Sequence, residues 1–562
     1  METKRMNCDV LIVGGGIGGL TAAVSLKERS PETDILVVEK QTAGYSGKAN
    51  RGGGVLQYFD LNRVKPIDFL GFHVNAIGSY LGDQELMLRY VEMNNEMMET
   101  LQGWGVNIPK KEDGSYNVMP TGPFTAMIRV DLDLTLKVRR RAEKLGVRFV
   151  DKTALAELLT DEGRIAGAAC YSILDGSFTV ISAKRVILAT GSQNYRIGSM
   201  WSSGRGDGIA AAYRAGAKMR NTEFGNFAQL VRIRSHNEVV FGENVMYNSD
   251  GEFITPHFQS HRETDISSRA IREWYLQMKA GKTVHLDYGE QPVADGGGGG
   301  DGMDPMERMW STPVGAEFRK LNDGSGAQVD TDMEVCPMFI GEQSPIYVGH
   351  DMQTSISGLY AIGDCSYCGS GSPGAVPAPP GRNRGSGILN AVFTGLVCAE
   401  SVAALPAIEA GKICDEQVEK MKAELFAPLE RKEGATAIDV IDLVQQAMAP
   451  VENSVVMQED RILAAMKLVE KAEELSKTLC AKDLHYLLSC REAEAMVLSA
   501  KMHFKASLMR KESRGWFLRE DYPEMDNANW LKWIIVQNVD GEMTFSTEDV
   551  PIEKWPIQIP KA

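Results

Sequence analysis

The chain has 562 residues and a formal net charge of −15, from 60 Lys and Arg against 75 Asp and Glu. Its 43% hydrophobic and 24% charged residues are ordinary for a globular protein, which excludes disorder over most of the chain and a fibrous rod. The acidic balance argues against nucleic-acid binding, because contacts to phosphates need clustered Lys and Arg. The first eight residues lack the apolar stretch of a signal peptide, and no apolar run approaches the ~18–20 residues that span a bilayer. We therefore expect a cytoplasmic protein with more than one folded core and no membrane span.

A glycine-rich turn follows the first apolar run of the chain. Residues 9–13 (DVLIV) predict a buried parallel strand, and residues 14–19 (GGGIGG) fit the pattern G-x-G-x-x-G. Residues 20–28 have helical spacing, and residues 34–38 form a second apolar run. Strand, turn, helix and strand together predict a β-α-β unit that binds a dinucleotide.

Each glycine in this turn has a physical reason. Gly14 allows the tight turn, Gly16 lets the backbone approach a pyrophosphate, and Gly19 lets helix and strand pack closely. Glu39, 20 residues beyond Gly19, can accept hydrogen bonds from ribose hydroxyls. The motif alone does not distinguish NAD from FAD. No second motif of this kind follows a strand, so a separate nicotinamide domain is not expected.

Separated motifs in the same order resemble those of the flavoprotein subunits of the fumarate reductase and succinate dehydrogenase superfamily. Besides the N-terminal unit, they are residues 46–53 (SGKANRGG), 189–191 (ATG), 206–209 (GDGI), 213–217 (YRAGA), 358–364 (GLYAIGD), 383–389 (NRGSGIL), 510–515 (RKESRG) and 519–523 (REDYP) with Trp530. Two of these motifs close apolar runs that predict further buried strands, at residues 185–191 and 358–364. Residues 104–114 also resemble the adenylylsulfate reductase flavoprotein.

The resemblance implies FAD as the cofactor. Membrane-bound members of the family carry a His that links FAD covalently, and Gly47 stands at the matching position, so non-covalent FAD is implied. The residues implied to contact FAD are Gly14, Gly16, Gly18, Gly19, Glu39, Lys40, Ser46, Gly47, Lys48, Asn50, Gly52, Gly53, Ala189, Thr190, Gly191, Asp207, Asp364, Ser386, Gly387 and Ile388.

The family's organisation implies an α/β fold in which a Rossmann-like FAD-binding domain is split by an α+β capping domain and followed by a C-terminal helical bundle. The two parts of the FAD-binding domain would be residues 1–225 and 335–410, with the capping domain at 226–334. Residues 411–515 have few glycines and apolar residues spaced by three and four, which predicts the helical bundle. Residues 516–562 would form a C-terminal extension.

The family's substrate-binding residues are only partly present. The Arg that donates a proton to fumarate in the family is replaced by Thr264, and residues 338–344 lack the family's substrate His. Arg262 and His261 lie close to the missing Arg in sequence, and whether Arg262 replaces it stays open. Arg384 matches the family's substrate Arg and could bind a carboxylate bidentately. We expect these three residues to be catalytic, with a substrate other than fumarate in its usual arrangement.

Cysteine and histidine spacing predicts no metal site in this chain. The cysteines are scattered apart from Cys365 and Cys368, so they do not provide the grouped thiolates of an iron–sulfur cluster. The resemblance implies instead a separate iron–sulfur, ferredoxin-like electron-transfer subunit. The expected function is an FAD-dependent oxidoreductase acting on a small anionic substrate. An adenylylsulfate reductase-like flavoprotein subunit and a flavin electron-transfer subunit without substrate chemistry stay open as alternatives.

Overall fold

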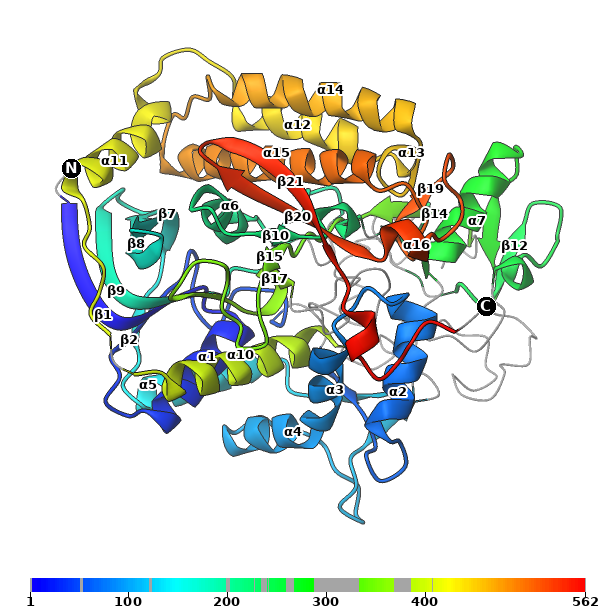
Figure 1. Ribbon diagram of the computed structural model, residues 1–562, viewed down its shortest axis with the longest axis horizontal. Helices are drawn as coiled ribbons and strands as arrows, with labels where there is room; N and C mark the ends of the chain where they lie inside the picture. Colours follow the sequence, from blue (N-terminus) through cyan, green and yellow to red (C-terminus); the bar gives the residue numbers. More distant parts are fainter. Residues whose placement is uncertain are drawn as a thin grey trace, which may run out of the picture.

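The structure is a computed structural model (Figure 1), which describes residues 3–50, 54–120, 124–198, 203–226, 228–233, 240, 242–258, 267–287, 333–367, 386–406 and 408–560. Its largest sheet has seven strands in the order β6-β2-β1-β9-β8-β7, with β16 also paired to β9. The bounds are β1 Thr3–Val13, β2 Ile35–Val38, β6 Arg148–Val150, β7 Thr153–Asp161, β8 Arg164–Ser172, β9 Phe178–Leu188 and β16 Leu359–Ala361. All four apolar runs that predict strands lie in this sheet.

The strands β6, β2, β1, β9 and β16 are parallel, and β7 and β8 continue the sheet antiparallel. Val13 at the end of β1 lies opposite both Val38 and Leu188, so these strands end at the same edge. Every residue of β2 is buried, as expected for a parallel strand covered on both faces. Residues 189–191 follow the end of β9 and are not part of it.

Two long helices cross on one face of this sheet, α1 (Ile17–Arg29) and α10 (Gly387–Ala404). They approach closely because Gly395 has no side chain: a Cβ there would lie 2.9 Å from the carbonyl oxygen of Gly18. The expectation that no segment is long and apolar enough to span a bilayer was wrong for α10. By length and composition alone, this helix is long and apolar enough to cross a membrane. However, 67% of α10 is buried inside the protein, as in the core helix of a globular fold.

A group of helices and one small sheet lies between β2 and β6 in the chain. Strands β3 (Val55–Tyr58), β4 (Val118–Pro120) and β5 (Ala126–Arg129) form an antiparallel sheet, and α3 (Gln84–Glu92) begins at the cap Asp83, whose carboxylate accepts two backbone N–H groups. The other helices here are α2 Pro66–Phe72, α4 Asn94–Gly103 and α5 Leu134–Lys144.

The described part of the predicted capping segment contains α7 (Ser267–Lys279), one strand pair and one strand that pairs with the segment following it. Strand β12 (Met246–Asn248) pairs with β13 (Val284–Leu286), and β11 (Ala228–Arg232) pairs with β14 (Val335–Phe339). The pairing of β14 with β11 favours a boundary after Phe339, a few residues beyond the expected one. The domain limits themselves stay a prediction.

The helical bundle contains α11 Asp415–Glu430, α12 Ala437–Met448, α13 Val451–Ser454, α14 Glu459–Ser476 and α15 Leu484–Met509. Helices α12, α14 and α15 lie side by side, and α15 also packs against α6 (Asp207–Arg214) of the FAD-binding part (Figure 1). Thr436 and Asp439 form a reciprocal capping box at the start of α12.

The C-terminal segment is built into the body of the protein. Strands β20 (Lys532–Val539) and β21 (Glu542–Asp549) extend a five-stranded sheet whose other members come from the FAD-binding part. Those members are β10 Met219–Arg220, β15 Ile346–Tyr347 and β17 Ser366–Tyr367. The remaining short elements are β18 Val456–Met457, β19 Leu518–Arg519 and α16 Asn527–Trp530.

A cluster of buried charges joins this segment to the body. Arg510 Nε donates to Glu223 at 2.8 Å and its Nη1 to Glu512 at 2.7 Å, while Arg514 Nη2 donates to Glu512 at 2.7 Å. All four side chains are fully buried. Burial raises the pKa of Glu223, whereas Arg510 opposes that rise.

We predict that Glu512→Gln destabilises the protein by about 3–5 kcal/mol, because it leaves two buried guanidinium groups with too few carboxylates. Denaturant unfolding of the purified protein measures the loss. The control is Glu474→Gln, which removes an exposed partner of Lys477 and should leave the midpoint nearly unchanged. Equal small effects of both substitutions would contradict the prediction.

A second prediction concerns pH. Burial lowers the pKa of His503 to about 4, although its Nδ1–H donates to the carbonyl of Thr222 at 3.3 Å. The contribution of the neutral, buried imidazole to the free energy of unfolding is complete above the unfolded pKa of ~6.5. It is lost as the pH falls towards 4, because the unfolded chain then binds a proton that the folded protein does not. His503→Asn should flatten the decline in the free energy of unfolding between pH 6.5 and 4. An unchanged slope in the variant would refute this assignment.

Candidate functional site

A cavity of about 300 Å³ opens at the carboxyl ends of the parallel strands of the large sheet. Val13, Val38, Ala189 and Ile362, at or just after the ends of β1, β2, β9 and β16, all line it. Ligands of open parallel sheets bind at this edge. The observed strand order therefore brings the ends of the sequence motifs together at one binding site.

The glycine turn forms one wall of the cavity. Gly14 has φ +111°, and a Cβ on it would lie 2.3 Å from the carbonyl oxygen of Ala189. A Cβ on Gly19 would lie 2.0 Å from the carbonyl oxygen of Gly14. Gly16 is the N-cap of α1 and lines the cavity, with no atom within 4 Å of an added Cβ. The first turn of α1 can therefore direct free N–H groups at a phosphate.

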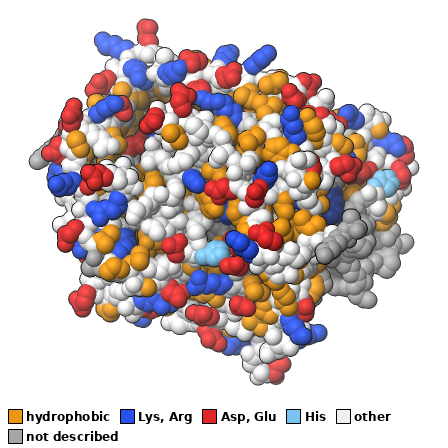
Figure 2. All heavy atoms as spheres, viewed as in Figure 1, with side chains coloured by type: hydrophobic (Ala, Val, Ile, Leu, Met, Phe, Trp, Pro, Cys, Tyr) orange, Lys and Arg blue, Asp and Glu red, His pale blue; other side chains and the backbone are white. Residues whose placement is uncertain are grey.

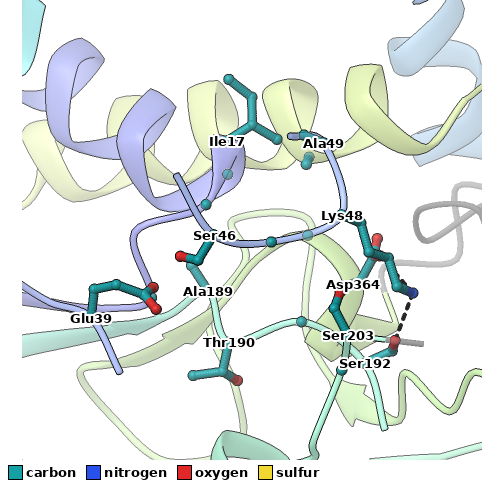
Figure 3. Close-up of a pocket in the computed structure, with 18 of the residues that line it drawn as sticks. Ile17, Glu39, Ser46, Lys48, Ala49, Ala189, Thr190, Ser192, Ser203 and Asp364 are labelled. Carbon is teal, nitrogen blue, oxygen red and sulfur yellow. Dashed lines mark hydrogen bonds and ion pairs between the residues drawn. The ribbon is translucent and has the colours of Figure 1, made fainter. Parts of the chain in front are cut away.

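Glu39 is fixed at the end of β2 on one side of the cavity (Figure 3). Its Oε2 accepts the backbone N–H of Gly15 at 2.7 Å, and its Oε1 accepts that of Gln41 at 2.8 Å. These two bonds orient the carboxylate before any ligand binds. A fixed acid at this strand end fits a ribose, as the sequence predicts.

Most of the predicted FAD contacts line this one cavity. They are Gly14, Gly16, Gly18, Glu39, Lys40, Ser46, Gly47, Lys48, Ala189, Thr190, Gly191, Asp207, Asp364, Gly387 and Ile388. Three others lie elsewhere: Gly19 packs under the turn, Asn50 donates to the carbonyl of Tyr45 at 2.7 Å, and Ser386 is buried at the start of α10.

The predicted Gly52, Gly53, His261, Arg262 and Arg384 lie outside the described residues. The structure therefore places most of the predicted cofactor residues and none of the expected catalytic ones, and the roles of both sets stay predictions.

Sequence reasoning missed a charged group from the helical bundle. Glu492 on α15 lines the cavity, where it accepts Lys40 Nζ at 3.0 Å and pairs with Arg196 and Arg205. Lys40 also donates to Asp207 at 2.5 Å. Burial would lower the pKa of Lys40, but the two carboxylates outweigh it and raise the pKa. Lys40 is therefore a permanent cation on this wall.

The side of the cavity across from Glu39 carries a second lysine, Lys48 (Figure 3). Lys48 Nζ donates to Ser192 Oγ at 2.9 Å, lies 3.3 Å from Asp364 Oδ2 and pairs with Glu342. In the chain, Ser192 follows β9, Asp364 follows β16 and Glu342 follows β14. The family segments in the sequence identified Lys48 and Asp364 of this cluster, but no sequence signal identified Ser192 or Glu342.

The residues present fit FAD. Open backbone at Gly16 and Gly191 leaves a cradle for phosphates, and an oriented acid stands beside it. Both glycines would obstruct this cradle if they carried larger side chains. The apolar side chains of Ile17, Val55 and Ile388 line the same cavity and could contact ring systems.

We predict that Glu492→Gln raises the dissociation constant of FAD roughly tenfold, because Lys40 and Arg205 on the cavity wall, together with Arg196, lose a charged acceptor. Titration of the apoprotein with FAD, followed by flavin fluorescence, measures this. Glu494→Gln is the matched control, since Glu494 lies on the same helix but pairs with Arg491 away from the cavity. A result in which the two variants bind FAD equally would contradict the prediction.

Two family models match the chain. The FAD binding domain model matches residues 9–273, and the model described as fumarate reductase flavoprotein C-term matches residues 445–561. The 8-methylmenaquinol:fumarate reductase flavoprotein subunit of Wolinella succinogenes is 24% identical, over 98% of this chain and 92% of its own length.

Solved structures share the fold over nearly the whole chain. E. coli quinol fumarate reductase has a TM-score of 0.82 at 19% identity, covering 98% of both chains. Adenylylsulfate reductase from Archaeoglobus fulgidus has a TM-score of 0.77 at 20% identity, covering 97% of this chain and 96% of its own. The α/β fold with a C-terminal helical region is therefore confirmed. With both family models and the cavity in agreement, the chain carries an FAD-binding domain and the C-terminal region of fumarate reductase flavoproteins, and it is an FAD-dependent oxidoreductase of the fumarate reductase and succinate dehydrogenase type.

Proposed function

We propose that this protein is the flavoprotein subunit of a cytoplasmic reductase or dehydrogenase, which acts on a small anionic substrate and exchanges electrons with a separate iron–sulfur subunit. The observation that carries the proposal is that both regions matched by the family models contribute to one cavity. The first supplies the glycine turn and Glu39, and the second supplies Glu492.

Bound FAD would supply electrons singly or as a hydride. The residues of this chain would hold and orient the FAD. The turn at Gly16 would bind the phosphates and Glu39 would bind a ribose. Lys40 and Lys48 would contribute positive charge to the cavity wall. Because Gly47 stands where relatives carry the linking His, the FAD would be bound without a covalent bond.

We assign substrate contacts to Arg384, Arg262 and His261. Arg384 would bind a carboxylate or another oxyanion through two parallel hydrogen bonds. Arg262 or His261 would deliver a proton, in place of the Arg that Thr264 replaces. This difference supports a small anionic substrate other than fumarate.

The relative from Wolinella succinogenes is named a flavoprotein subunit, which supports an assembly with other chains. The resemblance of residues 104–114 and the shared fold support adenylylsulfate reductase-like chemistry as a second candidate. An electron-transfer subunit without substrate chemistry is the third, and the experiment below separates the three.

The test is reoxidation of the reduced holoprotein without oxygen. Flavin absorbance is followed while fumarate, other unsaturated carboxylates or adenylylsulfate are added. We expect rapid reoxidation by one small anion, and a rate at least about tenfold lower in Arg384→Met because a charged hydrogen bond is lost. Arg148→Met, which removes an exposed pair with Asp34, is the control and should keep the wild-type rate.

Fast reoxidation by adenylylsulfate alone would favour the second candidate. Reoxidation by artificial dyes but by none of the anions, with FAD intact, would contradict the main proposal and favour the electron-transfer subunit.

A further inference from the structure

Four segments far apart in the sequence meet at Lys48. Lys48 follows the glycine at position 47, and its ammonium group contacts Ser192, Glu342 and Asp364. Figure 3 shows Lys48 extended towards Ser192 and Asp364. Lys48, Ser192 and Asp364 line the cavity, whereas Glu342 lies behind Lys48 and does not. Glu342 therefore holds the ammonium group from outside the cavity.

This ion pair is buried. The side chain of Glu342 is 0% exposed, and those of Lys48 and Asp364 are 15% and 13% exposed. Among the described residues, Glu342 Oε2 has no hydrogen-bond partner. A buried ion pair of this kind contributes little to stability, because desolvation offsets the attraction. Its location beside the cofactor cavity points to a role in the chemistry there.

The position of Lys48 along the cavity indicates which part of FAD it faces. Glu39 and the glycine turn recognise the ribose and phosphates of the ADP half. In Figure 3 Glu39 lies on one side and Lys48 with Asp364 on the other, with Ser46, Ala189 and Thr190 between them. The flavin half of a bound FAD would therefore lie on the Lys48 side.

We propose that Lys48 sets the reduction potential of the bound FAD, and that Glu342 fixes its ammonium group and partly offsets its charge. Reduction adds electrons to the flavin, so a nearby cation stabilises the reduced form and a nearby carboxylate opposes it. Lys48 and Glu342 thus shift the potential in opposite directions. This inference needs only the bound FAD and is independent of the proposed substrate and partner.

The experiment measures the midpoint potential of the FAD-loaded protein against redox dyes, without oxygen, substrate or partner. Lys48→Met should lower the potential, because the cation is lost. Glu342→Gln should raise it, because the remaining lysine is less neutralised. The double substitution should lie between the two single ones, and Lys48→Arg should stay near the wild type.

Lys218→Met is the matched control, since Lys218 pairs with Glu548 at 2.9 Å away from the cavity and should leave the potential unchanged. A second readout is thermal unfolding: Lys48→Met should lower the melting temperature by leaving Glu342 unpaired, and the double substitution should restore part of it. If Lys48→Met loses FAD, the upward shift in Glu342→Gln still tests the proposal. Unchanged potentials in Glu342→Gln, or shifts of the same sign in both single variants, would overturn it.

Discussion

The close contact between the glycine turn and the end of β9 determines where the cofactor can bind. A side chain at position 14 would meet the carbonyl of Ala189 at 2.3 Å, so the turn reaches the sheet edge only with glycine there. This contact aligns the start of α1 with the ends of the parallel strands, and the cavity forms in front of them. The crossing of α1 and α10 at Gly395 then covers the same edge from one face.

Buried charges join the distant segments to this sheet edge. Lys40, Asp207 and Glu492 link β2, α6 and α15, and Arg510 with Glu223 and Glu512 joins the C-terminal segment to the residues after β10. Each such charge is costly to bury without its partner. The pairs therefore select one arrangement of the bundle on the FAD-binding part, although they add little net stability.

The sequence predicted what local patterns encode and missed what depends on distant pairing. Apolar runs ending in glycine or an acid identified the strands around Val13 and Asp364, and spacing of three and four identified the bundle. Nothing in the periodicity of α15 distinguishes Glu492 from its other charged residues, so its place in the cavity wall was not predictable. The pairing of β20 with β10 was missed for the same reason, since a strand partner hundreds of residues away leaves no local signal.

The two lysines of the cavity differ in where their carboxylate partners lie. Lys40, which follows Glu39 in the chain, is enclosed by Asp207 and Glu492, so its charge stabilises this part of the cavity wall. Lys48 is held by Glu342 from outside the cavity on the opposite side, so its charge acts on the group that is oxidised and reduced. The fold thereby separates binding from redox tuning along one cavity. Structural changes in the helical bundle therefore affect cofactor binding through Glu492. Changes in the segment after β14 affect the reduction potential through Glu342.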